Sequence, residues 1–354
     1  MEATAVAREA LPPSLATRPT LRFEDAWVTG SAAVAGPAEG RGPLGHAFDE
    51  VCADHLLGRR TWERAESELH RRALDRLCGK LGLGRSDFDL LLAGDLLNQT
   101  VASAFAAREA DIPFCGLYSA CATFAEGLGL AAALCAAHYV RRVAVVVSSH
   151  HDAAERQYRF PTELGSQRPP TAQWTATGAV AVAVEAGAVD RALAKVVAFT
   201  PGRVLDYLVK DPFNMGAAMA PAAADTLAAH LAALGLPADS CGAVYTGDLA
   251  RVGVPVCEEL LRAAGWSVQV RDCGSELYDP AHQDVHAGGS GAACSALVFA
   301  ARILPDLRGG TYARACLCGT GSLHSPTTYQ QGESIPGIAH AVTLERVARG
   351  NGRP

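Results

Sequence analysis

The sequence predicts an α/β fold that is built from two similar halves. Short apolar runs typical of buried strands alternate along the chain with longer helix-forming segments. This order favours a mostly parallel sheet with helices on both faces. The order occurs twice, and short stretches recur with it: residues 92–96 match 245–249, and residues 119–122 match 292–295. Self-similarity over so long a period indicates duplicated domains rather than a solenoid.

The first half is expected to span residues 21–190, after a flexible extension at 1–20. A helix is predicted at 61–81, because apolar residues recur there every three or four positions and Gly82 follows as a stop signal. Apolar runs bounded by turn residues indicate buried strands elsewhere in this half. The other expected elements are strands at 21–36, 89–94, 113–118, 142–149 and 178–185, helices that end near 110 and 137, and an irregular polar segment at 152–177.

The second half, residues 191–350, repeats the order of the first. A helix is predicted at 221–234, because proline is favoured at a first helical position and Gly235 follows its end. The helix at 292–304 and the helix that ends near 137 are both rich in small residues, so we expect them to pack together as a central layer. The other expected elements are strands at 193–200, 242–246, 267–272, 313–319 and 337–346, and a helix at 254–264.

Cys121 lies where a predicted buried strand gives way to a helix of Ala, Leu and Gly. A helix that is apolar nearly all round is buried on all sides. The free N–H groups and the dipole at a helix start lower the pKa of a thiol, which is how a nucleophile is mounted on a rigid scaffold. The alternative is that Cys121 is a small buried hydrophobic residue, and both interpretations stay open here.

Composition excludes several classes of protein. Hydrophobic residues make up 49% of the chain and charged residues 19%, which is typical of a globular protein with a large core. The net charge is −6 and no basic run is present, so we expect no nucleic-acid partner. The eleven cysteines form no Cys-x-x-Cys pair, so we expect reduced thiols in the cytosol and no metal site. We expect neither a secretion signal nor a membrane-spanning helix.

Many short motifs occur in an order that resembles a known family. They lie between about residues 22 and 350, and together they resemble the stage V sporulation protein AD family, within the thiolase-like superfamily. Any one of them is weak, whereas the full set is specific. The motifs are Gly-Pro-Leu-Gly-His at 42–46, Ala-Gly-Asp-Leu-Leu-Asn-Gln at 93–99, Ser-Ser-His at 148–150, Ala-Glu-Arg-Gln at 154–157, Pro-Thr-Glu at 161–163, Met-Ala-Pro-Ala-Ala-Ala-Asp-Thr at 219–226, Ala-Gly-Gly-Ser-Gly at 287–291 and Glu-Ser-Ile-Pro-Gly-Ile-Ala-His at 333–340.

The resemblance implies a thiolase-like fold, with two βαβαβαββ halves arranged in αβαβα layers. It implies binding of dipicolinate (pyridine-2,6-dicarboxylate), alone or with Ca²⁺, in the pocket where the related enzymes hold an acyl group. It further implies a soluble, peripheral component on the cytoplasmic side of the forespore inner membrane, with membrane subunits of the stage V A channel as partners. A homodimer is expected too, paired through the strand at 143–147. We expect no other cofactor.

The residues argue against carbon–carbon condensation. A thioester-condensing enzyme needs a thiolate, oxyanion donors and a base. Cys121 offers the thiol, but the two places where the resemblance puts the helpers, 246–248 and 287–291, hold neither His nor the expected Asn. We therefore predict a ligand-binding protein. The alternatives are an acyl-thioester transferase or thioesterase that uses Cys121, and a scaffold with an empty pocket.

A dicarboxylate binder needs N–H donors, guanidinium groups or a bridging Ca²⁺. Glycine turns at 288–291 and 319–321 could present backbone N–H groups. Three arginines of the irregular segment, Arg156, Arg159 and Arg168, could close over the pocket. Solvation or ion pairing with Glu155 and Glu163 would also explain them. Asp95 and Asp248 would repel a dianion unless they bind Ca²⁺ or cap a helix, and we favour the caps. The candidate ligand-binding residues are Asp95, Asn98, Cys121, His150, Arg156, Arg159, Asp248, Gly289 and Ser290.

Overall fold

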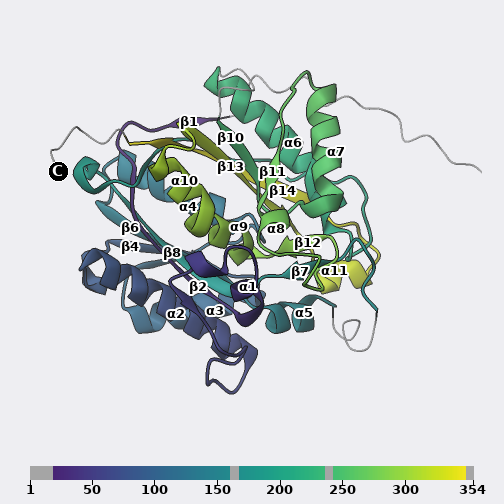
Figure 1. The fold of residues 1–354 in the computed structure, drawn as a ribbon, viewed down its shortest axis with the longest axis horizontal. Coiled ribbons are helices and arrows are strands. Elements are labelled where there is room, and N and C mark those ends of the chain that lie inside the picture. The colour runs from purple at the N-terminus through teal and green to yellow at the C-terminus, as the bar shows by residue number, and fades with distance from the viewer. Residues whose placement is uncertain (1–18, 160–166, 236–241, 348–354) are drawn as a thin grey trace, which may run out of the picture.

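The structure, a computed structural model, describes residues 19–159, 167–235 and 242–347. Two halves lie side by side, and their strands join into one twisted sheet system (Figure 1). We call the strands of the first half the first sheet and those of the second half the second sheet. Most of the predicted N-terminal extension, residues 1–18, lies outside the described residues, and so does the motif at 161–163.

The strands of the first half run in the order β2-β8-β6-β4-β5. The outer pairs β6–β4 and β4–β5 are parallel, whereas β2–β8 and β8–β6 are antiparallel. Short strands β1 and β3 pair with β9 and β2. The bounds are β1 Leu21–Arg22, β2 Trp27–Ala35, β3 Glu50–Val51, β4 Leu90–Gly94, β5 Phe114–Gly116, β6 Arg142–Ser149 and β8 Gly178–Glu185.

The second half repeats this topology, with the order β9-β14-β13-β10-β11 and the same alternation of directions. The duplication that the recurring letters predict is therefore confirmed in the strand order. Each sheet is mixed, and not mostly parallel as predicted, because the last strand of each half inserts antiparallel. The bounds are β9 Ala194–Thr200, β10 Ala243–Thr246, β11 Arg271–Asp272, β13 Arg314–Ser322 and β14 Gly337–Arg346, with β7 Gln173–Thr175 and β12 Gly288–Ser290 forming a separate parallel pair.

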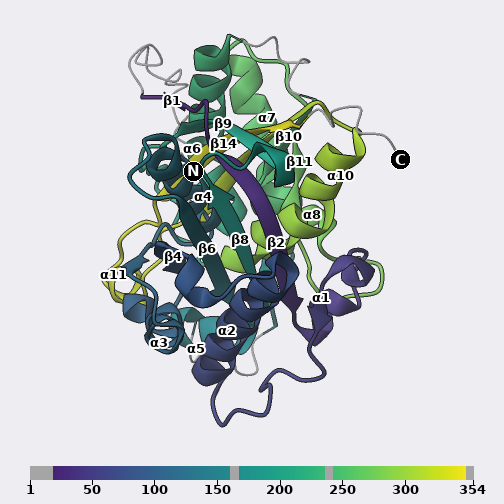
Figure 2. The ribbon, with the colours of Figure 1, turned by 90° about the vertical axis from the view of Figure 1, so that its left-hand side faces the viewer.

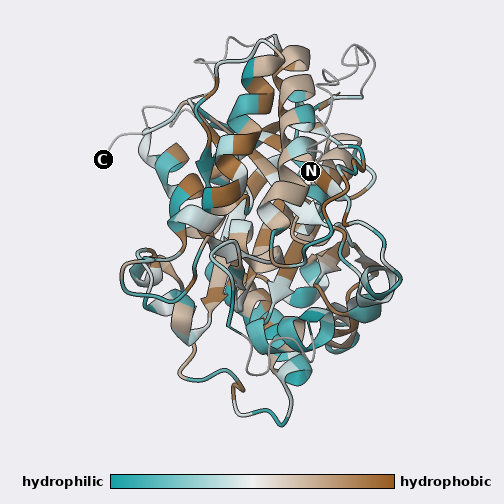
Figure 3. Ribbon diagram, turned by 90° about the vertical axis from the view of Figure 1, so that its right-hand side faces the viewer, coloured by the Kyte–Doolittle hydropathy of each residue, from teal (hydrophilic) through white to brown (hydrophobic). Residues whose placement is uncertain are grey.

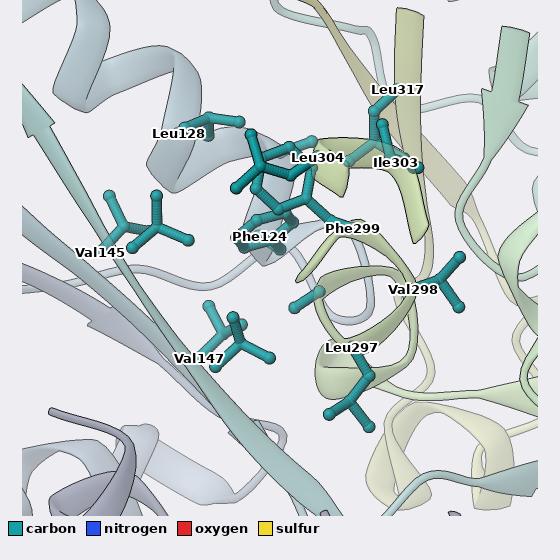
Figure 4. Packing of buried hydrophobic residues seen from close by; sticks show 14 of the residues in the cluster. Phe124, Leu128, Val145, Val147, Leu297, Val298, Phe299, Ile303, Leu304 and Leu317 are labelled. Atoms are coloured by element: carbon teal, nitrogen blue, oxygen red, sulfur yellow. The ribbon is translucent and has the colours of Figure 1, made fainter. Parts of the chain in front are cut away.

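The helices form three layers around the two sheets (Figure 2). Helices α4 and α9 lie in the middle. There the ring centroids of Phe124, in α4, and Phe299, directly after α9, are 5.1 Å apart (Figure 4). Helices α2 and α3 cover the outer face of the first sheet, and α6 and α7 cover that of the second. The bounds are α1 Pro37–Gly40, α2 Trp62–Leu81, α3 Val101–Ala110, α4 Thr123–Ala136, α5 His151–Arg159, α6 Met215–Leu234, α7 Ala250–Ala263, α8 Cys273–Glu276, α9 Ala292–Val298, the π-helical turn Phe299–Ile303, α10 Leu304–Gly309 and α11 Pro326–Gln330.

Helix α2 confirms its prediction at both ends. The Thr61 side chain accepts a hydrogen bond from the Arg64 amide at the start, and Gly82 ends the helix with a φ of 64°. Positive φ is a conformation that glycine adopts without strain.

Apolar residues follow the strands and inner helices, whereas hydrophilic residues lie mainly on outer helices and loops (Figure 3).

Helix α6 starts at Met215, so the prediction that Pro221 occupies its first turn is wrong. Proline inside a helix removes one hydrogen bond. Here the preceding turn is buried against β13 and β14, and its packing outweighs that loss. By length and composition α6 could cross a bilayer, but 78% of its apolar window is buried inside the fold, as in a core helix.

Other predictions are corrected by the observed edges and helices. The strand predicted as buried at 113–118 is β5, an edge strand whose three residues are exposed. Strand β6 lies between β4 and β8, so the predicted pairing of residues 143–147 across a dimer is wrong, because both of its edges are occupied. The segment predicted as irregular from 152 begins with α5, and the strand predicted at 267–272 is limited to β11.

Candidate functional site

The turn that carries Cys121 sits between β5 and α4 at the interface of the halves. Ala120, just before it, has a φ of 49°, in the left-handed region that non-glycine residues rarely adopt. The Thr123 hydroxyl fixes this turn, since it donates to the Ala120 carbonyl at 2.7 Å and accepts from the Ser119 amide at 3.0 Å. Cys121 follows this fixed turn and is only 6% exposed.

Two glycines of β13 make room for this turn. A Cβ on Gly321 would lie 2.3 Å from the Ser119 carbonyl oxygen, and a Cβ on Gly319 would lie 2.7 Å from the Ala125 Cβ. The glycine turn predicted at 319–321 is therefore wrong: these residues are strand residues paired with β14. Their glycines serve close packing between the halves rather than ligand binding.

Asp248, at the end of β10, approaches Cys121 from the second half. Its Oδ1 accepts from the Thr320 hydroxyl at 2.6 Å, and its Oδ2 accepts from the Gly291 amide at 3.1 Å. The Cys121 thiol also donates to this carboxylate. Burial raises the pKa of Asp248 to about 7, partly offset by the hydrogen bonds from Thr320 and Cys121.

The Cys121 thiol is held in its protonated form. Burial raises its pKa well above 9.0, and so do the charge of Asp248 and the thiol's own hydrogen bond to it. The Gly291 amide and the Arg159 charge lower the pKa, but by less. The predicted lowering by the helix start is therefore wrong for this thiol. Among the described residues, no histidine or amide side chain is hydrogen-bonded to its sulfur.

A small cavity surrounds the sulfur, with a volume of about 30 Å³. That volume has room for about one water molecule. We call it the inner chamber, and its lining combines both halves of the chain. The chamber is lined by Leu96, Ala120, Cys121, Ala154, Tyr158, Arg159, Thr175, Met215, Ser290, Gly291, Ser322 and His324.

A larger groove of about 500 Å³ lies outside the chamber, and we call it the outer groove. Tyr158 and His324 line both spaces and so separate them. The Tyr158 hydroxyl is 2.9 Å from that of Tyr118 and donates to the Leu96 carbonyl. Burial lowers the pKa of His324 to about 4, so its ring is neutral at pH 7. The groove is lined by Leu97, Asn98, Gln99, Thr100, Gly116, Leu117, Tyr118, Tyr158, Leu323, His324, Ser325 and Pro326.

Four of the predicted residues meet around the sulfur: Cys121, Arg159, Asp248 and Ser290. Arg159 is buried and paired with the Glu155 carboxylate, so its charge is largely compensated. Asn98 lies apart from this group, in the outer groove.

The other predicted residues serve different parts of the fold. Asp95 is buried, and its carboxylate accepts from the Leu97 amide and from the amide and hydroxyl of Ser103, which fixes the chain that enters α3. Arg156 pairs with Glu63 on the surface. Gly289 leaves space for the ring of Tyr278, to which a Cβ would come within 2.7 Å.

His150 is fully buried but does not line the chamber. Its ring bonds to the backbone carbonyl of His55, in a loop that precedes α2. Desolvation lowers the pKa of His150, so the ring is neutral at pH 7.

Sequence reasoning missed Tyr118, Tyr158, Thr320 and His324. Thr320 stands between the two glycines of β13, and that small-residue context was a usable signal for close contact. The other three side chains converge only because β5, α5 and the end of β13 meet in the fold.

Comparison with known proteins gives consistent results. The family model for stage V sporulation protein AD matches residues 17–345. Stage V sporulation protein AD of Bacillus subtilis (strain 168) is 43% identical over 322 residues, which cover 90% of this chain and 94% of that protein.

An OleA variant of Xanthomonas campestris has a similar structure, with a TM-score of 0.57 and 14% identity over 92% of this chain and 99% of that chain. AbyA1, a tetronic acid condensing enzyme, has a TM-score of 0.57 and 17% identity over 90% of this chain and 99% of that chain. The 3-oxoacyl-(acyl carrier protein) synthase III of Pseudomonas aeruginosa PAO1 has a TM-score of 0.54 and 13% identity over 92% of this chain and 99% of that chain. At these identities they show the fold alone, and they confirm the predicted thiolase-like architecture.

Proposed function

Because the chain belongs to the stage V sporulation protein AD family and therefore has a role in sporulation, we propose that it binds dipicolinate and supports its uptake into the developing spore without turning it over. The observation that carries the proposal is the match to the Bacillus subtilis protein over 90% of this chain. The environment of Cys121 supports the absence of turnover, since a buried protonated thiol beside a carboxylate is a poor nucleophile.

The outer groove is the binding place that we assign. The inner chamber, at about 30 Å³, is too small for an aromatic ring with two carboxylates, whereas the groove offers about 500 Å³. Tyr118 and Tyr158 supply aromatic surface for a flat ring. Asn98, Thr100 and Ser325 supply donors and oxygen ligands at the same place.

The charge of the groove bears on whether Ca²⁺ accompanies the ligand. The described residues that line it include neither an acid nor a base other than the neutral His324. A bare dianion would lose its hydration there without a compensating charge. The one-to-one calcium chelate is neutral, so we propose that the protein prefers the chelate.

We place the protein on the cytoplasmic side of the forespore inner membrane, held by membrane subunits of the stage V A channel. We also propose a homodimer. Strand β5, the exposed edge of the first sheet, supports it because an unpaired edge is a template for pairing with another chain.

A second candidate function is acyl transfer or thioester hydrolysis by Cys121. The strained Ala120 and the position of Cys121 before α4 favour it, as does the fold shared with condensing enzymes. The raised pKa of the thiol speaks against it.

Calorimetric titration of the purified protein distinguishes these functions. Dipicolinate with equimolar Ca²⁺ should bind, and removal of Ca²⁺ by EGTA should weaken binding. Loss of ring contacts in Tyr118→Ala should weaken binding about tenfold. Tyr139→Ala, which removes another exposed tyrosine, is the control and should leave it unchanged.

Cys121→Ala should keep most of the dipicolinate affinity, because the thiol lies behind Tyr158 and His324. Rapid acylation of Cys121 by an acyl-CoA, read as an increase in intact mass, would favour the second function. If the protein neither binds dipicolinate nor is acylated by an acyl-CoA, both functions are contradicted and a scaffold with an empty pocket is left.

A further inference from the structure

The structure assigns a metal site to His55, His150 and Asp152, and we propose that it binds one divalent transition-metal ion such as Zn²⁺. The site lies where the loop before α2 meets the end of β6 and the first turn of α5. It is separate from the inner chamber and the outer groove, since none of its residues lines either space. The proposal therefore stands independently of dipicolinate binding.

The three side chains converge on one point. The His55 Nδ1 atom is 3.4 Å from Asp152 Oδ2, and the His150 Nδ1 atom is 3.8 Å from the same oxygen. All three ligand atoms lie within 4.8 Å of one another. In a tetrahedral zinc site with bonds near 2.0–2.1 Å, neighbouring ligand atoms are about 3.3 Å apart. Small movements of the two rings are therefore enough to close the site.

The hydrogen bonds of His150 leave the correct nitrogen free. Its Nε2 atom is 2.6 Å from the His55 carbonyl oxygen and must donate to it, so Nδ1 carries the lone pair. In a metal-binding histidine, a hydrogen bond donated by the ring nitrogen that does not bind the metal commonly fixes the tautomer and the orientation of the ring. The side chain of His150 is fully buried, and its Nδ1 has no hydrogen-bond partner. A buried nitrogen without a partner is costly, and a metal ion would satisfy it.

His55 shows the same feature from the other side. Its Nδ1 is buried and has no hydrogen-bond partner, although 39% of the side chain is exposed. The two rings meet edge to face, with centroids 6.1 Å apart. The loop that carries His55 is fixed next to this residue, because the Asp54 carboxylate accepts hydrogen bonds from the amides of Leu56 and Leu57 at 2.8 Å each. The site is thus built from rigid segments and has an exposed side through which an ion can enter.

The donor set selects the kind of ion. Two imidazoles and one carboxylate suit Zn²⁺, Co²⁺ or Ni²⁺, whereas Ca²⁺ and Mg²⁺ prefer oxygen ligands. Three protein ligands leave a fourth position for water. Because His55 is far in sequence from the other two ligands, the ion would clamp the loop before α2 onto the β6–α5 junction.

Zinc titration tests the proposal, in the absence of dipicolinate because that ligand chelates metals. The parent is the full chain with Cys115→Ser and Cys241→Ser, so that an exposed thiol and a thiol outside the described residues do not compete. We expect one Zn²⁺ per chain, a higher melting temperature with Zn²⁺, and visible absorption when Co²⁺ replaces it. Ca²⁺ should produce none of these effects.

His55→Ala and Asp152→Asn should each weaken zinc binding at least about tenfold. Both side chains are partly exposed, so we expect the variants to fold, and far-ultraviolet circular dichroism checks this. His282→Ala is the matched control, because His282 forms an exposed 2.6 Å pair with Asp279, and it should bind Zn²⁺ like the parent. Equal zinc affinity in the parent and His55→Ala, or no zinc bound to the parent at micromolar concentration, would overturn the proposal.

Discussion

The buried Asp248 carboxyl should make the stability of the fold depend on pH in a defined direction. Its pKa is about 7 in the folded protein and near 3.9 in an unfolded chain. Between these values the folded state binds more protons than the unfolded state, so the free energy of unfolding falls as pH rises. The difference of about three pKa units corresponds to about 4 kcal/mol, of which about 3 kcal/mol falls between pH 5 and pH 8.

Burial also raises the pKa values of other carboxyl groups, among them Glu39, Asp95 and Asp272, so the assay compares two proteins that differ only at position 248. Urea denaturation of the parent and Asp248→Asn at several pH values gives the difference in unfolding free energy at each pH. The parent should lose stability relative to the variant as pH rises from 5 to 8. Asp279→Asn is the control, because hydrogen bonding to His282 lowers the pKa of Asp279, so this carboxyl stays ionised from pH 5 to 8 and its removal should give a difference that does not change with pH. A difference for Asp248→Asn that stays flat with pH would show that this carboxyl does not have a raised pKa in the folded protein.

Two further predictions concern packing and assembly. Gly319→Ala should destabilise the fold by about 1–3 kcal/mol, because its Cβ would crowd the Ala125 Cβ at 2.7 Å between two rigid elements, and an unchanged urea midpoint would contradict this. Light scattering at micromolar concentration should show a dimer for the parent and a monomer for Cys115→Lys, since a charged residue on the exposed β5 edge blocks strand pairing. A clean monomer for the parent would reject the dimer.

The sequence is sufficient to predict those features of the fold that depend on signals close together along the chain. The start and end of α2 follow from Thr61 and Gly82, and both are where the pattern predicts them. The turn at Cys121 and the duplication were also predicted, because a strand–helix boundary and recurring letters can both be read along the chain.

The rest depends on contacts between distant segments. The pKa of Cys121 is raised rather than lowered because Asp248 reaches it from the other half, which no local pattern indicates. The strand at β5 reads as buried but forms an edge, since apolar composition does not tell which strand ends a sheet. His150 was singled out, yet its neighbour His55 comes from a loop far away in sequence.

We propose that the ligand rests in the outer groove and that the sulfur behind it takes no part. A crystal structure of the protein soaked with calcium dipicolinate would locate the ligand. We expect the ring between Tyr118, Tyr158 and Asn98, with Cys121 unmodified behind His324. A ligand seated inside an expanded chamber against the Cys121 sulfur, or bound away from both spaces, would contradict it.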